Sequence, residues 1–206
     1  MALLHRATLT PSKIDLMTSW LPSRPWFTAH AGLRQIGAYR FDDPAGEVGL
    51  EAILVEADGA PVVHVPLTYR GAPLPGADDF LLGTAEHSVL GTRWVYDGCG
   101  DPVWASALAT VILASGEQAE EWVDADGTLV PRTPTVRVHA SGPRDGKAHA
   151  VDTVTTRDEG ATTVVAAGSL DLVVVRVVGT AAPGESRLTG SWNGAPPATL
   201  AVAHPR

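Results

Sequence analysis

The sequence predicts an α+β fold with an early helix, a largely antiparallel sheet, a second helix and a β-rich C-terminal part. Three observations support this class. Apolar residues recur at helical spacing over residues 11–21, alternation with a period of two begins near residue 34, and short strands separated by turn residues follow residue 117. The chain has 206 residues, enough for one substantial domain or two small ones.

The first predicted element is the early helix. Thr10 can act as its N-cap and Pro11 suits the first helical position, while Ile14 and Trp20 are among the apolar residues that repeat at helical spacing. Pro22 is expected to end the helix, because proline disrupts the helical hydrogen-bond pattern.

Alternation with a period of two predicts strands over residues 34–43, 47–56 and 62–70. The Asp58-Gly59 pair predicts a tight hairpin turn between the second and the third of these strands. Pro66 lies in the third strand and has no amide hydrogen to donate. That strand is therefore expected at an edge of the sheet or with a bulge.

The middle of the chain predicts a strand, a turn and a second helix. Trp94 and Tyr96 share one face of the strand, and Arg93 lies on the other. Asp101 is expected to cap a helix that Gly116 ends. This helix is apolar nearly all round, so most of its surface is expected to be buried.

The C-terminal part is predicted to consist of short strands. The segment 170–178, "LDLVVVRVV", is apolar on both faces and is expected to be a central strand. We expect residues 1–116 and residues 117–206 to form two units packed as one compact body.

Composition limits the function classes. The net charge of −8 argues against a nucleic-acid partner, because neutralising phosphates requires a basic surface. No apolar run approaches the ~20 residues of a membrane helix. The first residues do not resemble a secretory signal, because His5 and Arg6 interrupt the apolar stretch. The single cysteine cannot form an internal disulfide. A cytoplasmic location without membrane association is therefore expected.

Cys99 is the first candidate for chemistry. A nucleophilic cysteine needs a base and a positive environment, whereas Asp97 and Asp101 flank this thiol and raise its pKa. The start of the following helix has the opposite effect, because its dipole favours a thiolate. We interpret Cys99 as a small residue in a Gly-Cys-Gly turn.

Other catalytic patterns are weak. The seven histidines do not form a cluster with metal-ligand spacing, and there is no phosphate-binding glycine motif. Lys13 and Lys147, the only lysines, lie at a predicted helix start and in a loop. The pairs Asp42-Asp43 and Asp78-Asp79 lie in predicted turns. The sequence predicts no metal and no cofactor, and it does not favour an enzyme.

Three segments carry a resemblance to a known family. "WLPSRPWF", "VPLTYRGAPL" and "LGTRWVYDGCGDPVWASALATVIL" resemble the N-terminal cap domain of actinobacterial maltokinases and glucosamine kinases. The resemblance covers about residues 8–115 and implies a cystatin-like fold, in which an antiparallel sheet wraps a helix. In that family a kinase-like body follows the cap and supplies the catalytic residues.

The remainder of the chain departs from that family pattern. The ATP and metal motifs of the kinase-like body are absent from this sequence. The segment "TTVVAAGSLDLVVVRVV" is faintly similar to the strand pair that begins a kinase N-lobe, so the C-terminal unit could be a degenerate lobe. Where that lobe would carry lysine, this chain has valine, with Arg176 nearby.

Three functional hypotheses follow. The resemblance implies a non-catalytic accessory or regulatory partner of a sugar kinase, or of an enzyme of maltose, trehalose or glycogen metabolism. The alternative is a small-ligand or oligosaccharide binding module with Tyr69, Trp94 and Tyr96 on its concave face. A divergent sugar kinase is the third. The oligomeric state stays open, and the candidate ligand or partner surface consists of Trp26, Tyr69, Arg70, Arg93, Trp94, Tyr96 and Asp97.

Overall fold

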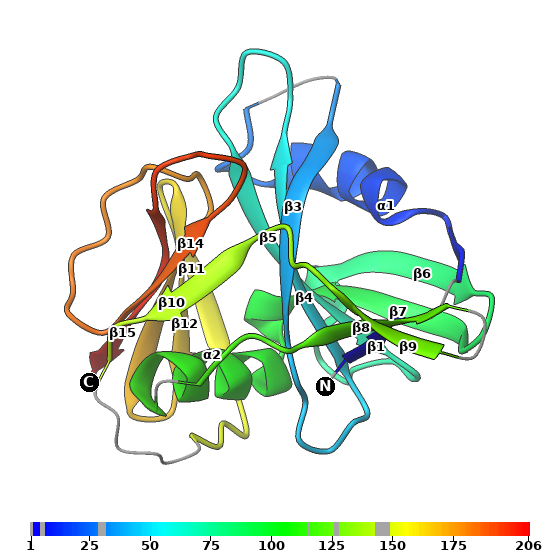
Figure 1. Ribbon diagram of the computed structural model, residues 1–206. Helices are drawn as coiled ribbons and strands as arrows, with labels where there is room; N and C mark the ends of the chain where they lie inside the picture. Colours follow the sequence, from blue (N-terminus) through cyan, green and yellow to red (C-terminus); the bar gives the residue numbers. More distant parts are fainter. Residues whose placement is uncertain (1, 5–6, 29–31, 115, 126–127, 143–148) are drawn as a thin grey trace.

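The computed structural model describes residues 2–4, 7–28, 32–114, 116–125, 128–142 and 149–206. Over these residues the fold is α+β, as expected, with two large antiparallel sheets and two α-helices arranged in layers (Figure 1). Helix α1 (Lys13–Trp20) covers one face of the first sheet, and helix α2 (Pro102–Ala114) lies between the other face and the second sheet.

The first sheet has the strand order β2-β6-β7-β5-β4-β3, with every neighbouring pair antiparallel. Its strands are β2 (Leu9–Thr10), β3 (Arg34–Phe41), β4 (Gly49–Glu56), β5 (Val63–Arg70), β6 (Leu81–His87) and β7 (Gly91–Asp97). Side chains alternate between the two faces of a strand. Ile53 and Val55 pack with α1, whereas Leu50 and Leu54 of the same strand pack with α2. At β4 the sheet is therefore buried on both faces.

The second sheet has the strand order β10-β14-β15-β13-β12-β11 and is also antiparallel. Its strands are β10 (Arg137–Ala140), β11 (Thr155–Glu159), β12 (Thr162–Ala167), β13 (Leu170–Val175), β14 (Arg187–Ser191) and β15 (Ala198–Pro205). β13 has a neighbour on each side, which confirms the expected central strand. The strand ends at Val175, before Arg176.

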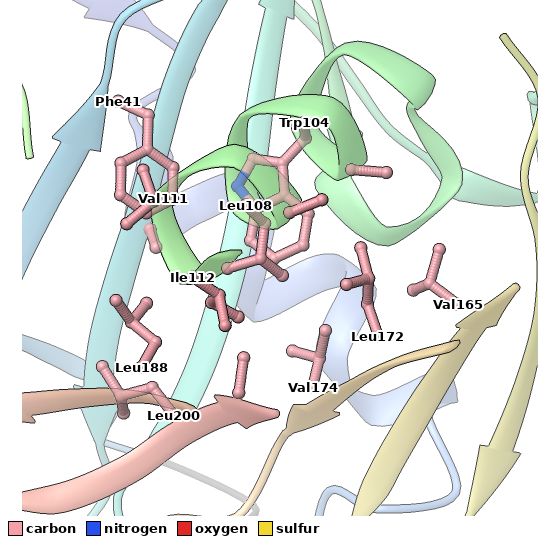
Figure 2. Close-up of a cluster of buried hydrophobic side chains, with 14 of the residues drawn as sticks. Phe41, Trp104, Leu108, Val111, Ile112, Val165, Leu172, Val174, Leu188 and Leu200 are labelled. Atoms are coloured by element: carbon pink, nitrogen blue, oxygen red, sulfur yellow. The ribbon is translucent and has the colours of Figure 1, made fainter. Parts of the chain in front are cut away.

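Helix α2 is the centre of the larger core. Trp104, Leu108 and Ile112 are fully buried, and they contact side chains of both large sheets. Figure 2 shows this helix with Leu172 and Leu188 of the second sheet around it. The expectation of a helix buried nearly all round is confirmed. The Asp101 carboxylate accepts a hydrogen bond from the Val103 amide at 3.0 Å, as expected of a cap.

A small third sheet has the order β1-β8-β9, formed by β1 (Ala2–Leu4), β8 (Glu121–Ala125) and β9 (Thr128–Arg132). The chain beside it runs along β3, the edge strand of the first sheet. The amide of Ala119 donates to the Arg40 carbonyl at 2.8 Å, and that of Val136 donates to the Ala38 carbonyl at 3.2 Å. These bonds cover an otherwise open edge. The proposed division of the chain at residue 116 stays a prediction.

The expected start of α1 is wrong by about two residues. Thr10 pairs with Glu86 in the first sheet and does not cap the helix. Ser12 is the N-cap, and its hydroxyl accepts from the Asp15 amide at 3.2 Å while the Asp15 carboxylate accepts from the Ser12 amide at 3.0 Å. This reciprocal capping box satisfies two amides that a helix start otherwise leaves free.

The expected edge position of the Pro66 strand is also wrong, because β5 lies between β4 and β7. The pairing of β5 with β7 begins only at Leu67, and the His64 amide donates instead to the Arg176 carbonyl at 2.8 Å. Amides of alternate strand residues point to the same side. Residue 66 therefore faces the same side as His64, between the bond of His64 to Arg176 and the pairing with β7 that begins at Leu67. The missing amide hydrogen of Pro66 removes no hydrogen bond at this position.

Strand β6 was not expected from the sequence. Only Ala85 of its seven residues is buried, so the strand has little apolar alternation. A bulge between Leu81 and Gly83 shifts the pairing with β7 and interrupts the two-residue pattern further.

Candidate functional site

The seven candidate surface residues lie on two opposite faces of the first sheet. Tyr69 is directly opposite Val95, which packs against α1. Arg70 is directly opposite Trp94, and residues at these positions point to the α2 side. Tyr69 and Trp94 therefore cannot line one concave face, and the binding surface expected from Tyr69, Trp94 and Tyr96 is wrong in this respect.

Three of the seven residues, Trp26, Tyr96 and Asp97, are buried. The Tyr96 hydroxyl accepts a hydrogen bond from the Leu74 amide at 2.9 Å, so the loop before β6 covers this side chain. Trp26 packs edge-on against Trp20 of α1 with ring centroids 6.0 Å apart. The sequence did not show this burial, because the covering residues come from other parts of the chain.

The other candidates keep part of their surface exposed. Arg70 forms a bidentate ion pair with the buried Asp101, at 2.7 and 2.6 Å. Arg93 donates to the Leu90 carbonyl at 2.6 Å, and Trp94 is half-buried. The expectation of a partner surface stays a prediction for these side chains and for Tyr69.

Asp97 forms an ion pair that joins the two large sheets. One Arg176 Nη atom lies 2.5 Å from the Asp97 carboxylate, and Arg176 Nε donates to the Thr163 hydroxyl at 2.8 Å. The guanidinium also lies over the Trp26 ring, 4.8 Å from its centroid. Burial opposes the charge of Arg176, but Asp97 outweighs it and the pKa of Arg176 is raised.

His64 lies beside this ion pair and is fully buried. Its Nδ1 lies 3.1 Å from the Val175 carbonyl and its Nε2 lies 2.9 Å from the Tyr39 hydroxyl. A carbonyl only accepts, so Nδ1 carries the proton and the Tyr39 hydroxyl donates to Nε2. Burial and the nearby Arg176 charge lower the pKa of His64 to about 3. The imidazole is a neutral structural link between the sheets.

A second buried carboxylate, Glu51, lies under α1. It accepts from Lys13 Nζ at 2.9 and 2.6 Å and from the Tyr69 hydroxyl at 2.8 Å, and it lies 3.0 Å from Arg40. Burial favours the neutral acid, but Arg40 and Lys13 outweigh it and lower the pKa of Glu51 to about 2. The sequence signal was a glutamate in the middle of a predicted strand whose other two glutamates lie at its ends.

Cys99 is buried in the short 3-10 turn Gly98–Gly100. Burial raises the pKa of its thiol well above the ordinary value; Arg176 opposes this shift, and Asp97 adds to it. A buried thiol with a raised pKa is a poor nucleophile, so the structure agrees with the interpretation of Cys99 as a turn residue.

Among the described residues, no group of three or more His, Cys, Asp or Glu side chains could hold a metal ion. Within that same part of the chain, no helix is long and apolar enough to cross a membrane. Lys147 lies outside the described residues.

A polar groove that the sequence did not predict lies between the segment 116–122, β9 and β10, with a volume of ≈ 490 Å³. Its charged lining includes Glu117, Glu120, Arg132 and Arg137. These residues are scattered over two strands and a connecting segment. The one available signal was the concentration of glutamates beside a tryptophan in "EQAEEW".

Comparison with known families finds one match in the first half of the chain. Residues 20–101 match the family described as the maltokinase N-terminal cap domain. No curated protein matches the chain. The matched segment begins at the last residue of α1, contains strands β3 to β7, and ends directly before α2. The resemblance to the cap domain is therefore confirmed over this segment.

Proposed function

We propose that this protein is a non-catalytic, cytoplasmic accessory or regulatory partner of a sugar kinase or another enzyme of α-glucan metabolism. The observation that carries the proposal is the match of residues 20–101 to the maltokinase N-terminal cap domain. A cap-like sheet with its own helix covering one face offers a stable platform for contacts with another protein.

The hairpin formed by β6 and β7 is the best candidate for the partner contact. At its tip Val89 and Leu90 are 57 % and 48 % exposed, although both are large apolar residues. The amides of both residues donate to His87 Nδ1, at 3.2 and 3.1 Å, so the tip has a defined shape. An ordered apolar tip loses little conformational entropy when a partner covers it.

Arg93 and Trp94 extend this tip along β7. Arg93 holds the Leu90 carbonyl, and Trp94 contributes a half-buried ring, which is the kind of residue that anchors protein interfaces. The proposed contact therefore combines the two aliphatic side chains of the tip with the Trp94 ring on one face of β7, while Arg93 on the opposite face fixes the tip through its bond to the Leu90 carbonyl.

An affinity pull-down with the full chain as bait, from the cytoplasm of its native host, tests the proposal. We expect mass spectrometry to find a sugar kinase or a glucan-metabolising enzyme enriched with the wild-type bait. The double variant Val89→Asp/Leu90→Asp should lose this enzyme, because it places charges in the apolar contact.

The matched control is Leu129→Asp/Val130→Asp, which changes two comparably exposed apolar residues of β9. This control should retain the enzyme. The accessory role is contradicted if no carbohydrate enzyme is enriched with the wild-type bait. Equal retention by the two double variants would instead reject the hairpin tip as the contact.

A further inference from the structure

The polar groove beside β8 lies outside the segment that matches the cap domain, so the proposed partner role does not account for it. Its volume of ≈ 490 Å³ falls within the ~300–1,000 Å³ of small-molecule sites. The candidate partner residues of β7 do not line it.

The walls of the groove are fixed by bonds that involve Gln118. Its side-chain amide donates to the Val136 carbonyl at 3.1 Å, and its side-chain oxygen accepts from the Val138 amide at 2.8 Å. The next amide, of Ala119, is bonded to the Arg40 carbonyl of the first sheet. The connecting segment is therefore held against both β10 and β3, which gives the groove a defined width.

The charges of the groove are mixed. Glu117, Glu120 and Glu121 come from the connecting segment and the start of β8, while Arg132 and Arg137 come from the facing strands. Glu121 and Arg132 approach each other within 3.6 Å. Such a lining does not concentrate one sign of charge, as a phosphate or a metal ion would require.

Several polar groups of the groove are available to a ligand. Within the part of the chain that the structure describes, the side chains of Glu117, Arg137 and His139 form no hydrogen bond or ion pair with another residue. They provide an acceptor, a set of donors and an imidazole that can do either. Trp122 is half-buried at the wall, and its indole N–H lies 3.4 Å from the Glu120 carboxylate.

We infer that this groove binds a neutral oligosaccharide, with the Trp122 ring against the apolar face of a sugar and Glu117, Arg137 and His139 bonded to its hydroxyls. A hydroxyl both donates and accepts, so it suits walls that contain carboxylates and guanidinium groups together. A tryptophan with one polar edge suits a ring that is apolar on its faces and polar around its rim.

Isothermal titration of the full chain with maltotriose, cellotriose and chitotriose tests this inference. These probes share the ring and differ in linkage or substituent. We expect saturable binding of at least one probe. Trp122→Ala should weaken that binding at least tenfold, Trp122→Phe should weaken it less, and Arg137→Ala should weaken it by several-fold.

Trp94→Ala is the matched control, because Trp94 is another half-buried tryptophan and lies outside the groove. This variant should bind the probe with wild-type affinity. The unfolding temperatures of all variants show whether a loss of binding reflects a loss of fold. Absence of binding to all three probes at millimolar concentration overturns the inference, and so does an equal loss in Trp94→Ala. Neither result bears on the pull-down, which depends on the hairpin tip.

Discussion

Asp97 and Glu51 are buried carboxylates of the same sheet, but their cations come from different distances along the chain. Within the described part of the chain, the bonded partners of Glu51 are Lys13, Arg40 and Tyr69. The cation bonded to Asp97, Arg176, lies 79 residues away and belongs to the second sheet region. The Glu51 cluster can therefore form within the first half of the chain, whereas Asp97 depends on the second half.

The two carboxylates also differ in the solvent access of their cations. The Lys13 side chain is 30 % exposed, while that of Arg176 is 1 % exposed. Removing one partner from a fully buried pair leaves the other without water or a counter-ion, and this is the more costly case. The segment that matches the cap domain therefore contains a buried acid, Asp97, whose cation lies outside that segment.

The largest effect is expected from Arg176→Met, which keeps a long apolar side chain and removes the charge. Asp97 would then be buried without its cation, and the free energy of unfolding should fall by about 3–5 kcal/mol. Urea unfolding measures this change. The double variant Asp97→Asn/Arg176→Met should recover part of the loss. A fall below about 1 kcal/mol would show that Asp97 is paired in another way.

A smaller effect is expected from Glu51→Gln. The variant removes the charge that holds Lys13 and Arg40, but both cations can reach water, so the loss should be about 1–3 kcal/mol. The control is Glu56→Gln, whose partner Arg34 is exposed, and its effect should be within about 0.5 kcal/mol. Equal losses in the two variants would remove the distinction between buried and exposed pairs.

The third prediction is a pH dependence of the free energy of unfolding that arises from His64, which lies beside the Asp97–Arg176 ion pair. The pKa of His64 is lowered from 6.5 to about 3, so its contribution is fully present above pH 6.5 and is lost as the pH falls toward 3. The free energy of unfolding should fall by about 1.4 kcal/mol per pH unit in this window. The lowered pKa of Glu51 acts only below pH 4.5. The raised pKa of Glu121 acts above pH 4.5 with the opposite sign, so it reduces the His64 slope at pH 5.0–6.0 and a variant of His64 is needed to separate the two.

His64→Gln tests the source of this slope, because glutamine does not titrate. Urea unfolding at several pH values between 5.0 and 6.0 should give a flatter dependence for the variant than for the wild type. An unchanged slope would mean that His64 is protonated in the folded state or that another group dominates.

The smallest effect is expected from Cys99→Ala, which removes one buried sulfur from the turn between β7 and α2. The free energy of unfolding should fall by only about 1 kcal/mol. The buried thiol of the wild type should react with a thiol reagent no faster than the protein opens. Complete labelling of the native protein within seconds would contradict the burial of Cys99.

Local patterns in the sequence predicted much of the fold. The α+β class, the strands β3, β4 and β7, a turn at Asp58-Gly59 and the buried helix α2 all follow from periodicity and turn chemistry, and the structure confirms them. The connection that contains this turn is longer than the expected tight hairpin, because β4 ends at Glu56 and β5 begins at Val63. The resemblance to the cap domain is confirmed over residues 20–101. These features depend on neighbouring residues, and a sequence records neighbours directly.

The candidate site was predicted less completely. Alternation along β7 correctly separated Arg93 from Trp94, but it could not show that Tyr96 and Asp97 are covered. Burial at these positions depends on which distant segment packs over the strand. The polar groove was missed for the same reason, since its two walls meet only after the chain has folded.

The sequence by itself determined the α+β class, the two helices and the strands β3, β4 and β7, but not β6, whose side chains lack apolar alternation. It also showed that Cys99 is a poor candidate for a nucleophile. The tertiary structure alone decided which charges are paired. Arg176 appears in the sequence as an isolated arginine after an apolar strand, and Asp97 as one of two acids beside a cysteine. Their 2.5 Å contact exists because the two sheets pack around α2 and because the His64 amide of β5 is bonded to the Arg176 carbonyl, and both arrangements form only when distant parts of the chain pack together.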